Sequence, residues 1–217
     1  MKIGTKQTLL FIGDSITDCG RSRPIGERNG LGNGYVAIVD SLLASFYPEA
    51  SIHVVNTGIG GNRVTDLAHR WQTDAIDIAP DWLSIMIGIN DVARQFDSIS
   101  LLEQIDPERF ESTYRELLGQ IRDQLKGLTL MTPFYLETNT EDPMRKLMDV
   151  YGKIVKRIAN DYDAKFVDTQ YFFNQHLKHR PTQSMCGDRV HPNQTGHMIL
   201  AKAFLQSIDF DWSHNKK

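Results

Sequence analysis

Short apolar runs alternate along the chain with longer stretches in which apolar residues recur every three or four positions. The short runs contain few polar residues, as expected of strands buried on both faces of a sheet. They predict five strands, at Thr8–Gly13, Ile52–Thr57, Trp82–Ile87, Leu128–Met131 and Lys165–Asp168.

The longer stretches have the spacing of amphipathic helices. Two of them begin clearly, because Asp106-Pro107 and Asp142-Pro143 each place an N-cap aspartate before a proline in the first helical position. The predicted helices cover residues 34–46, 107–125, 142–162, 172–177 and 193–208.

Alternating strands and helices predict an α/β fold, with a five-stranded parallel sheet and helices on both of its faces. A chain of 217 residues with 41% hydrophobic content can form one sizeable core. The sequence contains no repeat, linker or low-complexity tract. We therefore expect a single domain that spans residues 1–217.

Charge and composition exclude several classes of partner. The formal net charge of −3, without a basic stripe, gives no support to a nucleic-acid partner. No stretch approaches the roughly 18 apolar residues of a membrane span, and Leu9–Ile12 is too short for a signal peptide. We expect a soluble cytoplasmic protein without a membrane partner, in which Cys19 and Cys186 form no disulfide. His179, His197 and His214 share no ligand spacing, so no metal site is predicted.

Three candidate functional residues follow predicted strands, where ligands bind in α/β sheets. Ser15 ends an apolar run and is the candidate nucleophile, Gly61 lies in a glycine-rich turn, and Asn90 follows the third strand. The backbone N–H groups of Ser15 and Gly61 and the Asn90 amide can stabilise an oxyanion. Taken singly, each residue also fits a structural role in a turn or a helix cap. We expect Asp14 to form structural hydrogen bonds.

Asp188 and His191 supply a candidate acid and base near the last predicted helix. Because Asp188 and His191 are three positions apart, the carboxylate can accept from one ring N–H and leave the other ring nitrogen free for Ser15. Pro192 keeps His191 out of the helix, because residues before proline avoid the helical region. A turn-capping Asp188 with a surface histidine is the structural alternative. The order and strand-end placement of all these groups favour a catalytic role.

The four sequence blocks resemble those of the SGNH hydrolases, also called GDSL-type esterases and lipases. The blocks lie at Gly13–Ile16, Gly61, Gly88–Asp91 and Asp188–His191, within a resemblance that extends from Phe11 to His197. The resemblance implies a three-layer, flavodoxin-like fold and a Ser15–His191–Asp188 triad. It also implies that no cofactor is needed.

Longer segments resemble the intracellular acetylxylan esterases of bacilli. These segments are Phe11–Arg21, Ile85–Asp91, Met131–Tyr135 with Asp142–Arg145, and Asp188–Pro192 with Gly196–Ala201. In that subgroup an aromatic residue is expected just before the triad aspartate, where this chain has Gly187. The resemblance implies an esterase that removes acetyl or other short acyl groups from a small acylated carbohydrate. Two alternatives stay open, namely a lysophospholipase or acyl-thioesterase with the same triad, and a non-catalytic ligand-binding protein.

Arg94, Phe134 and Tyr135 are further candidates for substrate binding. Arg94 follows the third block, and the two aromatic residues follow the fourth predicted strand, where a ring can stack on a sugar. Burial under loops is the alternative for the aromatic pair. The sequence does not decide between a monomer and a homo-oligomer.

Overall fold

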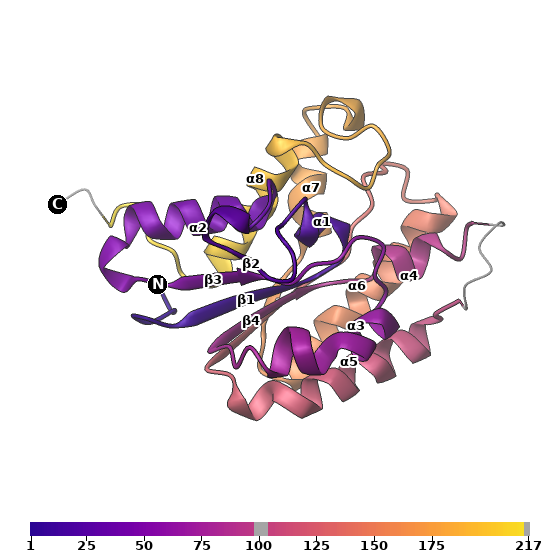
Figure 1. The fold of residues 1–217 in the computed structure, drawn as a ribbon. Coiled ribbons are helices and arrows are strands. Elements are labelled where there is room, and N and C mark those ends of the chain that lie inside the picture. The colour runs from indigo at the N-terminus through magenta and orange to yellow at the C-terminus, as the bar shows by residue number, and fades with distance from the viewer. Residues whose placement is uncertain (98–103, 215–217) are drawn as a thin grey trace.

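A six-stranded sheet forms the middle of three layers in the computed structural model, which describes residues 1–97 and 104–214 (Figure 1). The strand order is β2-β3-β1-β4-β5-β6. The strands are β1 (Thr8–Gly13), β2 (Gly26–Glu27), β3 (His53–Asn56), β4 (Trp82–Met86), β5 (Gly127–Met131) and β6 (Lys165–Val167).

Five of these strands are parallel, which confirms the predicted parallel sheet. The sheet differs from the prediction in having a sixth strand, β2, which pairs antiparallel with β3. β2 contains two residues in a segment rich in polar residues and glycine, so it leaves no periodic pattern in the sequence.

Helices cover both faces of the sheet (Figure 1). One layer contains α2, α7 and α8, in which α8 contacts the other two, and the other layer contains α3, α5 and α6. The helices are α1 (Ser15–Asp18), α2 (Tyr35–Phe46), α3 (Val64–Trp71), α4 (Ile89–Ala93), α5 (Pro107–Ile121), α6 (Pro143–Asp161), α7 (Thr169–Leu177) and α8 (Gln194–Ser207). Short 3-10 turns lie at Arg28–Gly30, Pro48–Ala50, Arg122–Gln124 and Thr182–Ser184, and a π-helical turn at Gln72–Ile76. Across the described ranges, no helix is long and apolar enough to cross a membrane.

All five predicted helices are present, and α1, α3 and α4 are additional. α7 begins at Thr169, before the predicted start, because the Asp168 side chain caps it by accepting from the Tyr171 N–H at 2.8 Å. α5 is shorter than predicted, because its last turn becomes a 3-10 turn at Arg122–Gln124.

The order of the strands places a crevice beside β1. β1 pairs with β3 on one side and with β4 on the other, so the chain leaves β1 in one direction and later returns past it. Such a reversal opens a crevice beyond the carboxyl ends of the strands. Within β1, Leu9–Ile12 is almost completely buried and therefore gives the crevice a rigid base.

Candidate active site

A serine, a histidine and an aspartate form a continuous hydrogen-bonded series at this edge of the sheet. The Ser15 Oγ lies 2.9 Å from the His191 Nε2, and the His191 Nδ1 lies 2.6 Å from the Asp188 Oδ2. Ser15 opens α1 directly after β1, whereas Asp188 and His191 lie in the loop before α8. The His191 and Asp188 side chains are 56% and 55% exposed, so a substrate can reach the series from solvent.

The Asp188 carboxylate is held by several donors besides the imidazole. Its Oδ1 accepts from the backbone N–H groups of Val190 at 2.9 Å and His191 at 2.8 Å, and from the Cys186 thiol at 3.1 Å. Partial burial acts to raise the pKa of Asp188, but these hydrogen bonds and the imidazole hold it well below its usual range. Asp188 therefore stays ionised and can orient the ring of His191.

Asp14 has the structural role expected from the sequence. It is the N-cap of α1, and its Oδ1 accepts from the Ile16 N–H at 3.0 Å. This bond starts α1 and turns Ser15 toward the crevice. Burial raises the pKa of Asp14 to about 7, against the opposing effects of the Ile16 hydrogen bond and of His191.

The candidate oxyanion donors lie on the loops that follow β3 and β4. Gly60 lies against Ser15, since a Cβ placed on it would be 3.7 Å from the serine Cβ. Gly61 has φ +81°, a conformation that favours glycine. The N–H groups of Ser15 and Gly61 meet no acceptor within residues 1–97 and 104–214. Both are therefore available to a ligand.

Asn90 reaches the same place from the second residue of α4. Its Nδ2 donates to the Asn62 carbonyl at 3.0 Å, which leaves one of its two N–H groups for a ligand. Gly88 precedes α4 with φ +130°, and a Cβ there would lie 2.9 Å from the Pro133 ring. A larger residue at 88 would therefore displace the turn that presents Asn90.

The three candidate substrate-binding residues have different surroundings. Arg94 is half-buried, and its Nη2 lies 3.9 Å from the Cβ position of Gly61, at the mouth of the site. Tyr135 is 9% exposed and lies near the triad loop, because its hydroxyl accepts from the Arg189 guanidinium at 3.3 Å. Phe134 has no exposed surface and packs on Phe173, with ring centroids 4.4 Å apart. The structure thus corrects the expectation for Phe134, whose ring belongs to the core and cannot stack on a sugar.

Two further buried polar residues, which the sequence patterns did not predict, shape the site. Asp18 accepts from the Gly60 N–H at 2.9 Å and pairs with Arg23 at 2.6 Å, which fixes the glycine turn against α1. Asn56 donates to the Thr17 and Leu31 carbonyls and accepts from the Gly58 N–H. Asn56 is the next-to-last residue of the predicted strand Ile52–Thr57, and a polar residue at that position is the one signal that could have indicated its role.

Cys19 and Cys186 are free thiols in the structure. The Cys19 Sγ lies 3.5 Å from the His197 Nε2, and Cys186 contacts Asp188. In the part of the chain that the structure describes, no group of three or more His, Cys, Asp or Glu side chains could hold a metal ion.

The site combines a hydrogen-bonded serine, histidine and aspartate with free N–H donors at the edge of a parallel sheet. This arrangement is that of a serine hydrolase. The chain belongs to the GDSL-like lipase/acylhydrolase family, whose model matches residues 11–199. This family membership and the three-layer architecture agree with the resemblance found in the sequence.

Individual relatives match the chain over nearly its whole length. An acetylxylan esterase from Geobacillus stearothermophilus is 53% identical over 219 residues, which cover 100% of both chains. The crystal structure of the esterase Axe2 from that organism superposes with a TM-score of 0.95 at 54% identity, over 98% of each chain. LAE5, an alpha/beta hydrolase from the metagenome of Lake Arreo, gives a TM-score of 0.94 at 42% identity, over 97% of this chain and 98% of its own.

Proposed function

We propose that this chain is a serine esterase that removes acetyl or other short acyl groups from carbohydrate esters such as acetylated xylo-oligosaccharides. The hydrogen-bonded series Ser15–His191–Asp188, open to solvent beside free N–H donors, is the observation that carries the proposal. The carbohydrate part is supported by full-length similarity to an acetylxylan esterase. The cytoplasmic location stays a prediction, and the choice between a monomer and a homo-oligomer stays open.

The first half of the proposed reaction transfers the acyl group to the enzyme. The Ser15 Oγ bonds to the ester carbonyl carbon while the His191 Nε2, 2.9 Å away, takes the hydroxyl proton. The carbonyl electrons move onto its oxygen, which accepts from the N–H groups of Ser15 and Gly61 and from the Asn90 amide. The bond to the sugar oxygen then breaks, and this oxygen takes the proton from His191. The acyl group is left on Ser15.

The second half releases the acid and restores the serine. Water gives a proton to His191 and attacks the acyl carbon, and a second oxyanion forms at the same donors. When it collapses, the Ser15 oxygen leaves and takes the proton back from His191. Asp188 stabilises the imidazolium in both halves, because its carboxylate accepts from Nδ1 and stays ionised.

The first test concerns the nucleophile. The variant Ser15→Ala should lose activity on p-nitrophenyl acetate by more than about 1,000-fold, because members of a triad act as a unit. Ser41→Ala is the control, since this exposed serine hydrogen bonds only within α2. An organophosphonate should label the wild type once per chain, at Ser15. Labelling at another residue, or full activity of Ser15→Ala, would overturn the proposal.

The second test concerns the substrate. A lipid acyl chain gains about 0.8 kcal/mol for each methylene that the protein buries. In residues 20–34, which follow α1, Ile25 is the one large apolar side chain that is well exposed, so this segment forms no apolar lid. We expect kcat/KM to be highest for acetyl esters and peracetylated xylose to be deacetylated. If kcat/KM instead rises steadily beyond eight-carbon acyl chains and acetylated sugars are untouched, the lipid or thioester alternative replaces this substrate class.

A further inference from the structure

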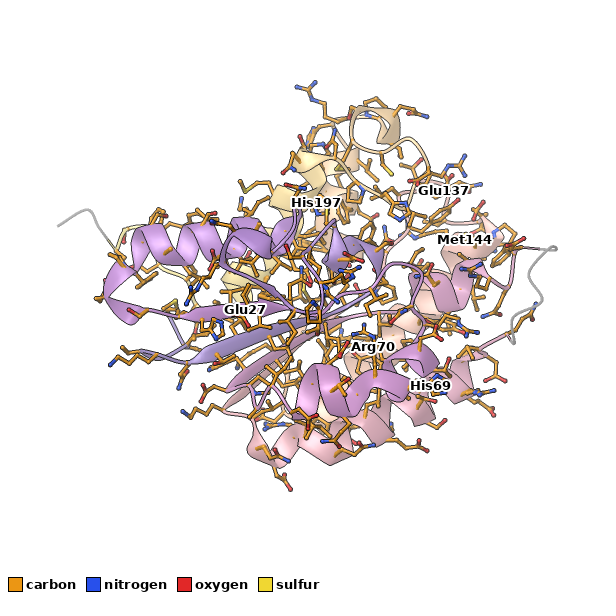
Figure 2. All side chains as sticks on the ribbon, viewed as in Figure 1. Glu27, His69, Arg70, Glu137, Met144 and His197 are labelled. Carbon is orange, nitrogen blue, oxygen red and sulfur yellow. The ribbon has the colours of Figure 1, made fainter. Side chains whose placement is uncertain are left out.

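Arg70 connects three loops around the crevice. This arginine lies near the end of α3, and Figure 2 labels it between that helix and the sheet. Its Nε donates to the Asn62 Oδ1 at 2.7 Å, its Nη1 to the Thr57 carbonyl at 2.6 Å, and its Nη2 to the Gly13 carbonyl at 3.1 Å. All three nitrogens of one guanidinium are therefore engaged by different segments.

An ion pair with Asp74 also holds the guanidinium in place. Its Nη1 pairs with the Asp74 Oδ2 at 2.8 Å, and the two side chains are only 13% and 24% exposed. Asp74 lies in the π-helical turn Gln72–Ile76, where its carbonyl accepts from the Thr57 hydroxyl at 3.0 Å. Because both side chains are mostly buried, salt screens this ion pair less than it would an exposed one.

Two of the candidate oxyanion donors are linked to Arg70 through Asn62. Asn62 directly follows Gly61, so the side-chain bond from Arg70 fixes the end of the turn that carries the Gly61 N–H. The Asn62 carbonyl accepts from the Asn90 Nδ2 at 3.0 Å, which orients the amide that donates to the oxyanion.

The third donor is linked through the end of β1. Gly13 is the last residue of β1, and Ser15 is two positions further along. The bonds from Arg70 to the carbonyls of Gly13 and Thr57 connect the ends of β1 and β3. The same guanidinium therefore sets the distance between the Ser15 segment and the turn that carries the other donor.

We propose that Arg70 is a positioning residue that fixes the three oxyanion donors relative to one another. The inference rests on the proposed esterase function. An oxyanion hole stabilises the transition state only when its donors lie within hydrogen-bond distance of the developing charge, and a misplacement of about 1 Å costs about 100-fold in rate. Arginine suits this position because its planar group directs several N–H bonds at once, which a lysine cannot do.

The test compares Arg70→Met with the matched control Arg122→Met. Arg122 also donates from a guanidinium to two carbonyls, those of Tyr162 and Leu125, but it precedes β5 at the opposite end of the sheet. Both variants lose an arginine that holds main-chain segments together. The melting temperature of each full-length variant measures the loss of stability, and phosphonate titration of Ser15 counts the folded sites.

We expect Arg70→Met to lower kcat per titrated site about 10- to 100-fold on p-nitrophenyl acetate, with KM within about threefold of the wild type. Arg70→Lys should recover less than a tenth of the lost activity, and Arg122→Met should keep the wild-type kcat. The acid limb of the pH profile should be unchanged, because Arg70 does not touch His191. An unchanged kcat in Arg70→Met, a change confined to KM, or an equal fall in Arg122→Met would refute the inference.

A double-mutant cycle separates positioning from general destabilisation. If Arg70 acts through the donors, Arg70→Met should cost less in the Asn90→Ala background than in the wild type. Fully additive losses would mean that the two residues act independently, and the positioning role would be wrong.

One further variant covers the case in which Arg70→Met does not fold. Asn62→Ala removes one bond of Arg70 and leaves its ion pair with Asp74 intact. It should lower kcat at least about threefold without changing KM, and an unchanged kcat would overturn the inference. Failure of the esterase function itself would look different, because the wild type would then neither hydrolyse esters nor react with the phosphonate.

Discussion

His197 should make the protein less stable in mild acid. This residue lies on α8 and is 5% exposed (Figure 2). Its Nδ1 accepts from the Tyr35 N–H at 3.2 Å, so Nδ1 carries no proton and Nε2 faces the Cys19 sulfur. Tyr35 begins α2, where the helix dipole disfavours a cation. Burial and, to a lesser extent, the charge of His191 lower the pKa of His197 to about 4.

The size of the effect follows from proton linkage. An ordinary histidine titrates near pH 6.5, so between about pH 6.5 and pH 4 the unfolded chain binds a proton that folded His197 does not. Its contribution to stability is complete above pH 6.5 and is lost as the pH falls toward 4. Between about pH 8 and pH 5 the loss amounts to about 2 kcal/mol. For a domain of this size that is a fall of roughly 4–8 °C in melting temperature.

The assay is urea unfolding of the wild type and of His197→Asn at both pH values. Asparagine keeps a side-chain acceptor for Tyr35 but does not titrate. Burial raises the pKa of Asp14 and of Asp91 to about 7, so these carboxyls stabilise the fold below their unfolded pKa, and that stability is lost as the pH rises through 7. Their contribution is common to both proteins and cancels in the comparison.

On going from pH 8 to pH 5, the change in the free energy of unfolding should be about 2 kcal/mol more favourable to the folded state in His197→Asn than in the wild type. The control is His69→Asn, which removes an exposed histidine from α3 and should leave the difference between the two pH values unchanged. Equal pH dependence in the wild type and His197→Asn would show that folded His197 takes up a proton freely, and the reasoning would be refuted.

Two further predictions concern catalysis. Asn90→Ala should lower kcat on p-nitrophenyl acetate by about 100- to 1,000-fold with little change in KM, because the amide acts on the oxyanion; a change in KM alone would make Asn90 a substrate-binding residue instead. Gly187→Trp should narrow the range of accepted acyl groups, since a Cβ at this exposed position beside Asp188 meets nothing within 4 Å and a ring can cover the site. Rates on acetyl, propionyl and butyryl esters measure this, and an unchanged ratio of these rates would show that residue 187 does not limit the acyl group.

Most of the fold could be predicted from the sequence, because its strands and long helices leave strong periodic patterns. β1 and α6 begin within a residue of their predicted starts, and α6 is marked by Asp142 before a proline. α3 was not predicted, although its eight residues, Val64–Trp71, are amphipathic, because it is short and follows a glycine turn. α1 and α4 hold four and five residues, too few for a pattern to emerge.

The sequence predicts those residues of the candidate site that have a reactive or polar side chain and directly follow a strand. Ser15 and Asn90 are of this kind, because the carboxyl ends of parallel strands meet at one edge of the sheet. His191 lies in the loop before α8, and its spacing from Asp188 is what indicated its role. Arg70 is different, since an arginine near the end of an amphipathic helix usually faces solvent. The substrate-binding role predicted for Phe134 was wrong. Whether an aromatic ring that follows a strand faces solvent or packs in the core, as Phe134 does on Phe173, depends on tertiary packing.

The hydrogen bond between Ser15 and His191 joins residues 176 positions apart in the chain. During synthesis, Ser15 therefore leaves the ribosome well before His191. A nascent chain that has formed β1 to β5 would therefore contain Ser15 and the oxyanion loops but could not yet activate the serine. The appearance of esterase activity on a chromogenic ester would then mark the time at which the loop before α8 reaches the site.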